Sequence, residues 1–328
     1  MKFAFITLFT LLALSCSSDN DDNSGNNGNE SGRNYKQDMR DYVMGISQAA
    51  KAVNPNFAII PQNGIELVTS NGEDDGTPDA AYLAAIDGNG QEDLFYGYDN
   101  DDQATNTEDT AYLRTLLNIS KNAGNTILVT DYTSTTSKIA DSYSKNAAAG
   151  YISFAATHRS LDTIPAGTPR NVNANNITSL TQAKNFLYLI NPGGYATKAA
   201  FINAVSSTNY DAVIMDLFLG NEQFTATEIA QLRNKANGGK RLVICYMSIG
   251  EAEDYRYYWQ SGWANNSPDW IAAENPDWPG NYKVKYWDEE WQGLIFKNQD
   301  SYLSKITTAG FDGVYLDIID AFEYFETN

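Results

Sequence analysis

Short runs of apolar and β-branched residues alternate along the chain with amphipathic segments of helical length. Strands of a parallel sheet produce such continuous apolar runs because both of their faces are covered. The runs FLYLIN and LVICYMS are typical. The pattern predicts eight strands, at 57–62, near 85–97, and at 126–131, 151–156, 186–191, 212–217, 242–248 and 313–318.

Helix-like segments lie between these runs, and several have capping residues at their ends. Thr225 is suited to begin a helix, and the pair Gly238-Gly239 is suited to end it. Strands joined by helical crossovers favour an α/β fold, a single (β/α)8 TIM barrel over residues 35–328. A doubly wound open sheet is the alternative. The predicted helices span 36–52, 107–122, 137–148, 196–206 and 225–237.

The order of elements is unusual at both ends of this domain. The domain starts with the helix 36–52, and about ten residues follow the last strand, too few for the helix expected there. The first helix can fill that gap, so we expect a circularly permuted barrel in which it completes the ring after the last strand. Its start and the C-terminal residues would then lie together on the face where the strands end.

The first 34 residues differ from the rest of the chain. Residues 1–15 contain Lys2 and an apolar run ahead of Cys16, which resembles the signal peptide of a bacterial lipoprotein. Residues 16–34 are rich in Asn, Asp, Ser and Gly and predict a flexible tether. We expect lipidation of Cys16 and anchoring at the bacterial outer membrane or cell surface, with a plain secretory signal as the alternative.

The composition of the chain limits the kinds of molecule that the protein is expected to bind. A net charge of −19 argues against nucleic acid and favours a neutral or cationic partner, although the charge could serve solubility alone. The domain has one cysteine, Cys245, whose apolar run predicts a buried thiol, and one histidine, His158, which argues against metal sites built on histidine clusters. We expect a monomer with no metal and no other cofactor.

Acidic and amide residues follow most of the predicted strands. In barrels of this type the catalytic and substrate-binding side chains lie at the carboxyl ends of the strands. Each carboxylate alone could be a helix cap or an ion-pair partner, but together they suggest glycosidic cleavage, which requires one protonated and one ionised carboxyl. The strand-end residues are Gln62, Asn63, Glu92, Asp131, His158, Arg159, Asn191, Asp216, Glu251, Glu253, Asp317 and Asp320.

All six tryptophans fall between Trp259 and Trp291, in a long connection after the seventh predicted strand. Flat rings with a polar edge suit the faces of sugars. The alternative is that these rings form a small core of the insertion itself, and we expect some of each. Trp287 is our candidate for a substrate-binding ring.

Four longer motifs are distinctive, namely CYMSIGEAEDYRYYW (245–259), PDWPGNYKVKYWDEEW (276–291), GFDGVYLDIIDAFEYF (310–325) and NPNFAIIPQNG (54–64). They resemble glycoside hydrolase family 114, the endo-α-1,4-polygalactosaminidase-like barrels. The family usually places the IIPQNG and DGNGQEDLFYG segments after the GVYLDIID strand, whereas here they come first. The resemblance therefore implies the same permutation as the missing last helix.

The resemblance also implies site residues. Asp317 matches the acidic residue at the end of the family's last motif strand, and Glu92 matches the glutamate that ends a later strand. We expect Asp317 to be the nucleophile or base and Glu92 the acid. Asp216, Glu253, Arg256 and Asp320 fall on other family-like positions, and the expected substrate-binding set is completed by Glu251, Asn63, Asp131 and Trp287.

The expected function is that of a glycosidase, endo-acting on a galactosamine-containing or other amino-sugar polysaccharide. One departure concerns the substrate, because family members with shown activity tend to carry a Lys-Asn pair where this chain has Gln62-Asn63. Likeness of fold does not transfer substrate. The alternatives are a non-catalytic surface glycan-binding lipoprotein and a structural surface protein without a pocket.

Overall fold

The computed structural model describes residues 32–327, so the expected signal peptide (1–15) and lipidation site Cys16 lie outside the described residues. Across the described range, no helix is both long enough and apolar enough to cross a bilayer. All eight predicted strands are present. They are β1 (Ala58–Pro61), β2 (Gly88–Glu92), β3 (Thr126–Tyr132), β4 (Ile152–Ala156), β5 (Phe186–Tyr188), β6 (Ala212–Met215), β9 (Leu242–Ser248) and β13 (Gly313–Asp317).

These strands form two parallel sheets, with the orders β1-β13-β9-β6-β5 and β2-β3-β4. The first strand therefore pairs with the last, which is the neighbour relation of a ring of strands. The two sheets meet edge to edge, since a parallel bridge joins Gln62 to Gly90 beside β1 and β2, and β4 lies next to β5. The described hydrogen-bonded ladder is thus divided between two sheets, whereas one continuous barrel sheet was expected.

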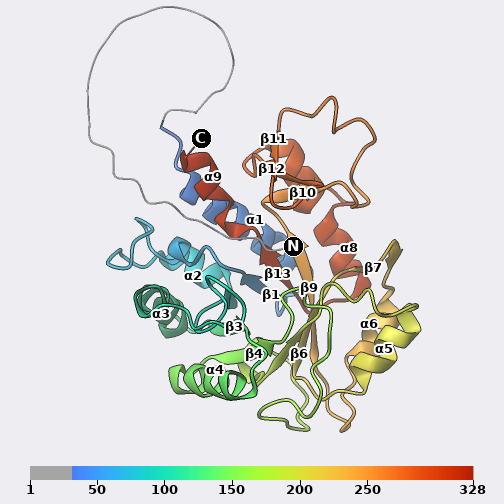
Figure 1. Ribbon diagram of the computed structural model, residues 1–328. Coiled ribbons are helices and arrows are strands. Elements are labelled where there is room, and N and C mark those ends of the chain that lie inside the picture. The colour runs from blue at the N-terminus through green and yellow to red at the C-terminus, as the bar shows by residue number, and fades with distance from the viewer. Residues whose placement is uncertain (1–31, 328) are drawn as a thin grey trace, which may run out of the picture.

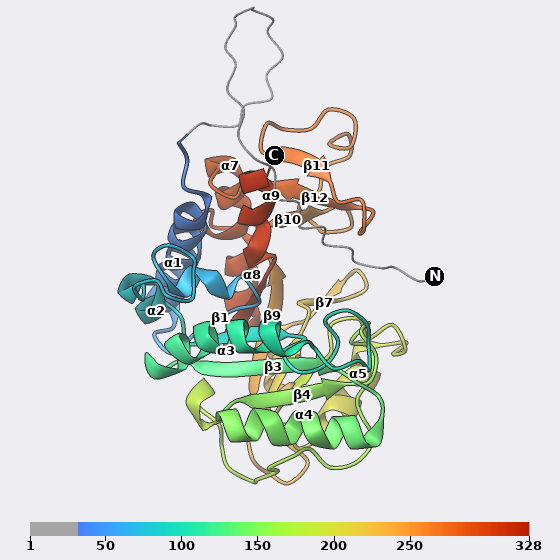
Figure 2. The same ribbon diagram turned by 60° about the vertical axis from the view of Figure 1, so that its left-hand side comes forward.

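Helices cover the outer faces of both sheets (Figures 1 and 2). Thr225 begins α6 with a capping box, as its sequence predicts, but the helix ends at Leu232 and not at Gly238. The chain then turns, and Asn234 forms a bridge with Lys240. The helices are α1 (Tyr35–Val53), α2 (Ala80–Ala85), α3 (Thr107–Asn122), α4 (Thr136–Ala149), α5 (Lys198–Ser206), α6 (Ala226–Leu232), α7 (Glu289–Gln292), α8 (Tyr302–Ala309) and α9 (Phe322–Thr327).

Helix α1 packs against α8 on one side and against α2 on the other. It therefore lies between the helix that precedes β13 and the helix that precedes β2. A short helix, α9, nevertheless follows β13, so the end of the chain is not without one. The start of α1 lies beside α9, because Lys36 pairs with Glu326 at 2.6 Å and the ring of Tyr35 contacts Phe325.

A long insertion between β9 and β13 carries its own small antiparallel sheet, in the order β10-β12-β11. Four tryptophans pack there in a chain of ring contacts that runs from Trp259 through Trp263 and Trp270 to Trp291, and the last two are buried. The indole of Trp291 donates to the carbonyl oxygen of Ile249 at 3.0 Å. The rings thus build most of the insertion's own core. Its strands are β10 (Glu251–Glu253), β11 (Ile271–Glu274) and β12 (Asn281–Val284), and a further hairpin joins β7 (Phe218–Leu219) to β8 (Glu222–Gln223).

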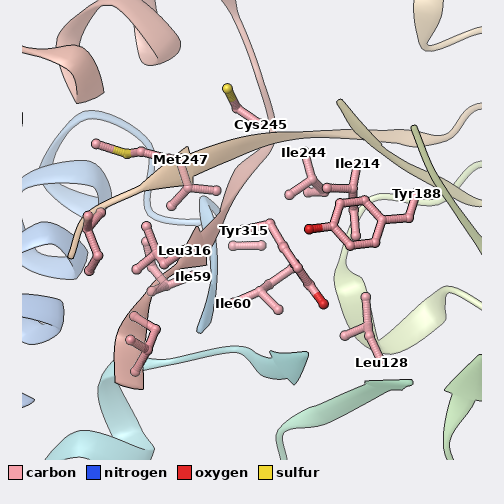
Figure 3. Close-up of a cluster of buried hydrophobic side chains, with 14 of the residues drawn as sticks. Ile59, Ile60, Leu128, Tyr188, Ile214, Ile244, Cys245, Met247, Tyr315 and Leu316 are labelled. Carbon is pink, nitrogen blue, oxygen red and sulfur yellow. The ribbon is translucent and has the colours of Figure 1, made fainter. Parts of the chain in front are cut away.

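The interior between the sheets is filled by side chains of alternate strand residues. Ile60, Ile214 and Leu128 lie there with the rings of Tyr188 and Tyr315 (Figure 3). The Cys245 thiol is buried, as predicted. This packed interior forms the floor on which the cavity described below rests.

Candidate active site

A cavity of about 970 Å³ opens at the carboxyl ends of the parallel strands, and the insertion forms one wall of it. Six carboxylate residues line it, which concentrates negative charge at one place. Eight of the ten residues predicted for catalysis or substrate binding line this cavity, namely Asn63, Glu92, Asp216, Glu251, Glu253, Arg256, Asp317 and Asp320. Of the other strand-end residues, Gln62, Arg159 and Asn191 also line it.

Glu92 ends β2 and is fixed from two sides. Its Oε2 accepts a hydrogen bond from the Asn63 side-chain amide at 3.0 Å, and its Oε1 accepts one from the hydroxyl of Tyr132. The Asn63 carbonyl oxygen accepts from the Glu92 backbone N–H at 3.0 Å. Asn63 therefore holds both the backbone and the carboxylate of Glu92.

Asp317 ends β13 and accepts a hydrogen bond from the hydroxyl of Tyr246. Burial, followed by the charge of Glu92, raises the pKa of Asp317 to about 7. The two residues end strands that both neighbour β1, so their backbones are separated by roughly 10 Å, two strand spacings. Both side chains line the same cavity, and Asp317 lies close enough to Glu92 for the charge of Glu92 to affect its pKa.

Tyrosine rings support this pair from below. The Tyr188 hydroxyl donates to the Gln62 side-chain oxygen at 2.8 Å. The ring centroids of Tyr188 and Tyr315 are 5.1 Å apart (Figure 3). Tyr315 fits only because residue 90 is glycine, since a Cβ at Gly90 would lie 2.0 Å from its hydroxyl oxygen. Gly90 thus allows a tyrosine to fill the space between the strands of Glu92 and Asp317.

Three residues within two positions of the ends of β1, β2 and β13 have left-handed backbone conformations. They are Asn63, Asp93 and Ile318, with φ of 59°, 58° and 59°. Such a conformation is tolerated by Asn and Asp but is a genuine outlier for a β-branched residue. Backbone strain of this kind persists where surrounding structure fixes it, and it clusters at functional sites.

A second group of charges surrounds Arg256. Its guanidinium pairs with Asp216 at 2.7 Å and with Glu253, and the hydroxyl of Tyr255 also donates to Glu253. Burial raises the pKa of Asp216, although the charge of Arg256 opposes this shift. Arg256 is therefore shared by two carboxylates.

Glu251 and Asp320 lie on the insertion side of the cavity. Glu251 pairs with Lys283 at 2.6 Å through Oε1, whereas its buried Oε2 has no hydrogen-bond partner within the described chain. Burial and then the charge of Glu323 raise the pKa of Asp320 to about 6. Lys283 therefore acts on both carboxyl groups, through an ion pair with Glu251 and through its charge near Asp320.

Arg159 follows β4 and also lines the cavity. It pairs with Asp93 at 2.9 Å and with Asp101 at 2.6 Å, and its guanidinium lies 3.9 Å from the centroid of the Tyr132 ring. The same Tyr132 donates to Glu92. Arg159 thus contacts the residue that holds Glu92, and its charge is already paired.

Two residues predicted to bind substrate lie elsewhere. Asp131 is buried behind the strand, where its carboxylate accepts from Ser142 at 2.6 Å and from the backbone N–H groups of Phe95 and Tyr96. Side chains of a strand alternate between its faces, so Asp131 points to helix α4 while Tyr132 points to the cavity.

Trp287, the second of these residues, packs away from the cavity. Its ring contacts Tyr35 and Phe325, and the guanidinium of Arg33 lies 4.5 Å from the ring centroid. It joins the insertion to the start of α1. The tryptophan that does line the cavity is Trp278, which is 64% exposed.

The tyrosines around the pair were not singled out in the sequence. Tyr132, Tyr188 and Tyr246 all line the cavity and donate hydrogen bonds to Glu92, Gln62 and Asp317. Strand alternation could have found them, because each points to the same side of its sheet as the residue that it contacts. In residues 32–327, no group of three or more His, Cys, Asp or Glu side chains is arranged to hold a metal ion.

Comparison with known proteins gives a family match over the second half of the chain. The model of glycoside-hydrolase family GH114 matches residues 166–328. An uncharacterized protein of Methanocaldococcus jannaschii is 37% identical over 182 residues, which cover 54% of this chain and 50% of that protein. An uncharacterized protein of Deinococcus radiodurans is 42% identical over 122 residues, 37% of each chain. This chain therefore spans half or less of the length of these relatives.

Proposed function

Because residues 166–328 belong to glycoside-hydrolase family GH114, we propose that the protein cleaves a polysaccharide with Glu92 and Asp317 as its catalytic pair. The observation that carries this proposal is that two carboxylates, at the ends of the strands on either side of β1, line one open cavity, where the charge of Glu92 helps to raise the pKa of Asp317. Glycosidic cleavage requires such a pair, with one carboxyl protonated to assist the leaving oxygen and the other ionised.

The raised pKa of Asp317 supplies the protonated member near neutral pH. Both oxygens of Glu92 accept hydrogen bonds, the arrangement of an ionised carboxylate. The free protein therefore favours Asp317 as the acid and Glu92 as the nucleophile or base, the reverse of the roles expected from the sequence. Azide tests this assignment, because a small anion restores cleavage when it replaces a missing nucleophile. We expect Glu92→Ala to form a glycosyl azide of inverted anomeric configuration, whereas a glycosyl azide from Asp317→Ala should keep the configuration of the substrate.

The proposed substrate is a galactosamine-containing or other amino-sugar polysaccharide, cleaved within the chain. Six carboxylates line the cavity, and two of them, Asp216 and Glu253, share Arg256. A polymer with free amino groups would be attracted to this surface and to a protein of net charge −19.

The direct test is incubation with partly deacetylated α-1,4-galactosaminoglycan, followed by measurement of new reducing ends and of product size. We expect shortened oligosaccharides from the wild type and at least a thousandfold loss of rate in Glu92→Gln and Asp317→Asn. Glu289→Gln, a change at a carboxylate with an 82% exposed side chain, is the matched control and should keep full activity. Full activity in both pair variants would refute the pair. Binding without cleavage by the wild type would instead identify a non-catalytic surface glycan-binding protein.

We further propose that the two sheets are the wall of one circularly permuted (β/α)8 barrel. The family match covers β5 to β13, whereas Glu92 lies in β2, outside it. The contacts of β1 with β13 and of β4 with β5 support this arrangement. A rejoined variant that starts near residue 166 and links the present ends should fold and keep activity. Failure of that variant to fold would count against the permutation.

The anchor remains a proposal from the residues around Cys16. A lipidated protein should partition with outer membranes and incorporate labelled palmitate, and Cys16→Ala should do neither. Palmitate incorporation by Cys16→Ala would exclude lipidation at this residue.

A further inference from the structure

The insertion wall of the cavity carries an aromatic ring that the carboxylate pair does not use. Trp278 lies in the turn between β11 and β12, lines the cavity and is 64% exposed. The other five tryptophans of the insertion pack against one another or against α1 and α9. A large ring left in water at the mouth of an acidic cavity is suited to stacking on a ligand.

A second exposed ring lies at the same end of the small sheet. Tyr255 is 62% exposed and also lines the cavity. Glu253 pairs with Asn281 in the β10–β12 ladder, and the backbone N–H of Asp254 donates to the Gly280 carbonyl at 2.8 Å. Trp278 and Tyr255 therefore flank the last pair of this ladder and border one part of the cavity.

Glu251 provides an acceptor on the same wall. Only 1% of this residue is exposed, and its Oε1 accepts from Lys283 at 2.6 Å and from the Asn275 amide at 2.8 Å. Its Oε2 is buried without a partner among the described residues. Because an unsatisfied buried acceptor is costly, it indicates a donor that arrives with a ligand.

Asn275 connects this acceptor to the exposed ring. The side-chain amide of Asn275 donates to Glu251. Its backbone carbonyl accepts a hydrogen bond from the backbone N–H of Trp278 at 3.3 Å. Asp320 lies close enough to Glu251 for their charges to interact, and it lines the same cavity. The turn that carries Trp278 is thus fixed in place beside two carboxyl acceptors.

We propose that Trp278, Glu251 and Asp320 form a sugar-binding subsite on the insertion. One pyranose ring of the polysaccharide stacks on Trp278, and its hydroxyl or ammonium groups donate to Glu251 and Asp320. Sugar acids are excluded, because their carboxylates would meet two carboxyl groups. This subsite rests on the proposed function and deepens it, since it selects the sugar beside the catalytic pair.

The test measures binding in a Glu92→Gln background, in which cleavage is prevented. The probes are partly deacetylated α-1,4-galactosaminoglycan and α-1,4-polygalacturonate, which share linkage and ring configuration but carry opposite charges. We expect Trp278→Ala to weaken binding of the first polymer roughly tenfold, about 1.4 kcal/mol, and Trp278→Phe to restore most of it. Tyr98→Ala is the matched control, because Tyr98 is 52% exposed but does not line the cavity. We expect it to bind like the parent.

Three results would overturn the subsite: unchanged binding in Trp278→Ala, preference for polygalacturonate, or no binding of either polymer. Cleavage assays on the otherwise wild-type chain separate this outcome from the proposed function. Cleavage with a KM that does not depend on Trp278 overturns the subsite and leaves the hydrolase. Binding that depends on Trp278, with no cleavage, supports the subsite and overturns the hydrolase.

Discussion

Replacement of Asp317 by asparagine should stabilise the protein at alkaline pH while it removes a catalytic group. The pKa of Asp317 is about 7 in the folded protein and has an ordinary value of 3.8. Between these values the unfolded chain has lost its proton and the folded protein has kept it, so stability falls as pH rises. Above about pH 7 both states are ionised, and the destabilisation is complete.

The magnitude follows from this difference. It is roughly three pKa units, which at about 1.36 kcal/mol per unit corresponds to at most about 4 kcal/mol. Because the carboxyl faces the cavity, solvent reduces this value, and we expect Asp317→Asn to gain about 2 kcal/mol at pH 8. At pH 5 only about a third of that gain should be present.

The assay is urea unfolding followed by tryptophan fluorescence at about pH 5 and pH 8. Asp102→Asn is a control of opposite sign, because hydrogen bonds from Thr135 and Thr133 hold the pKa of Asp102 well below its usual value. That variant should lose stability, and more at pH 8 than at low pH. The reasoning about Asp317 is refuted if Asp317→Asn is less stable than the wild type at pH 8, or if its gain is equal at both pH values.

Three further changes test the packing around the site. Lys235→Ala should cost 3–5 kcal/mol in urea unfolding, because it leaves Asp211 without the partner that it contacts at 2.9 Å with both side chains fully buried. A loss below about 1 kcal/mol would contradict this. Gly90→Ala should cost about 1–3 kcal/mol and reduce cleavage, since the new methyl group must displace Tyr315; unchanged activity would show that Tyr315 does not support the pair. Thr225→Ala should lower stability by about 1 kcal/mol through loss of the capping box, and Thr225→Asn should restore it.

The strands were predictable because burial on both faces leaves a continuous apolar run in the sequence. The face to which a given strand-end residue points was harder to predict. Asp131 and Tyr132 both end β3, but alternation sends the acid to α4 and the tyrosine to the cavity. Register against β2, where Thr130 pairs with Glu92, fixes this choice, and register depends on contacts far apart in the chain.

The insertion was the least predictable part of the site. Its strands are short and partly polar, and the pairing of β10 with β12 joins residues separated by a long loop. Composition placed the tryptophans there but could not separate a core ring such as Trp291 from an exposed ring such as Trp278. That difference arises only when the small sheet packs on the main fold. The end of α6 was misjudged for a similar reason, because Arg233 leaves the helix to pair with Asp312 in a distant loop.

The contact between α1 and α9 has a consequence for synthesis of the chain. Lys36 and Glu326 are separated by 290 positions in the sequence. The pairing of β1 with β13 can form only after β13 has been synthesised. At roughly 5–20 residues per second, the first helix leaves the ribosome about 15–60 s before α9, whereas its neighbour α2 follows early in the chain. During that interval Tyr42, Val43 and Ile46, all buried in the finished protein, must be shielded by other parts of the nascent chain or by chaperones. Formation of the β1–β13 pairing is therefore tied to a late stage of translation.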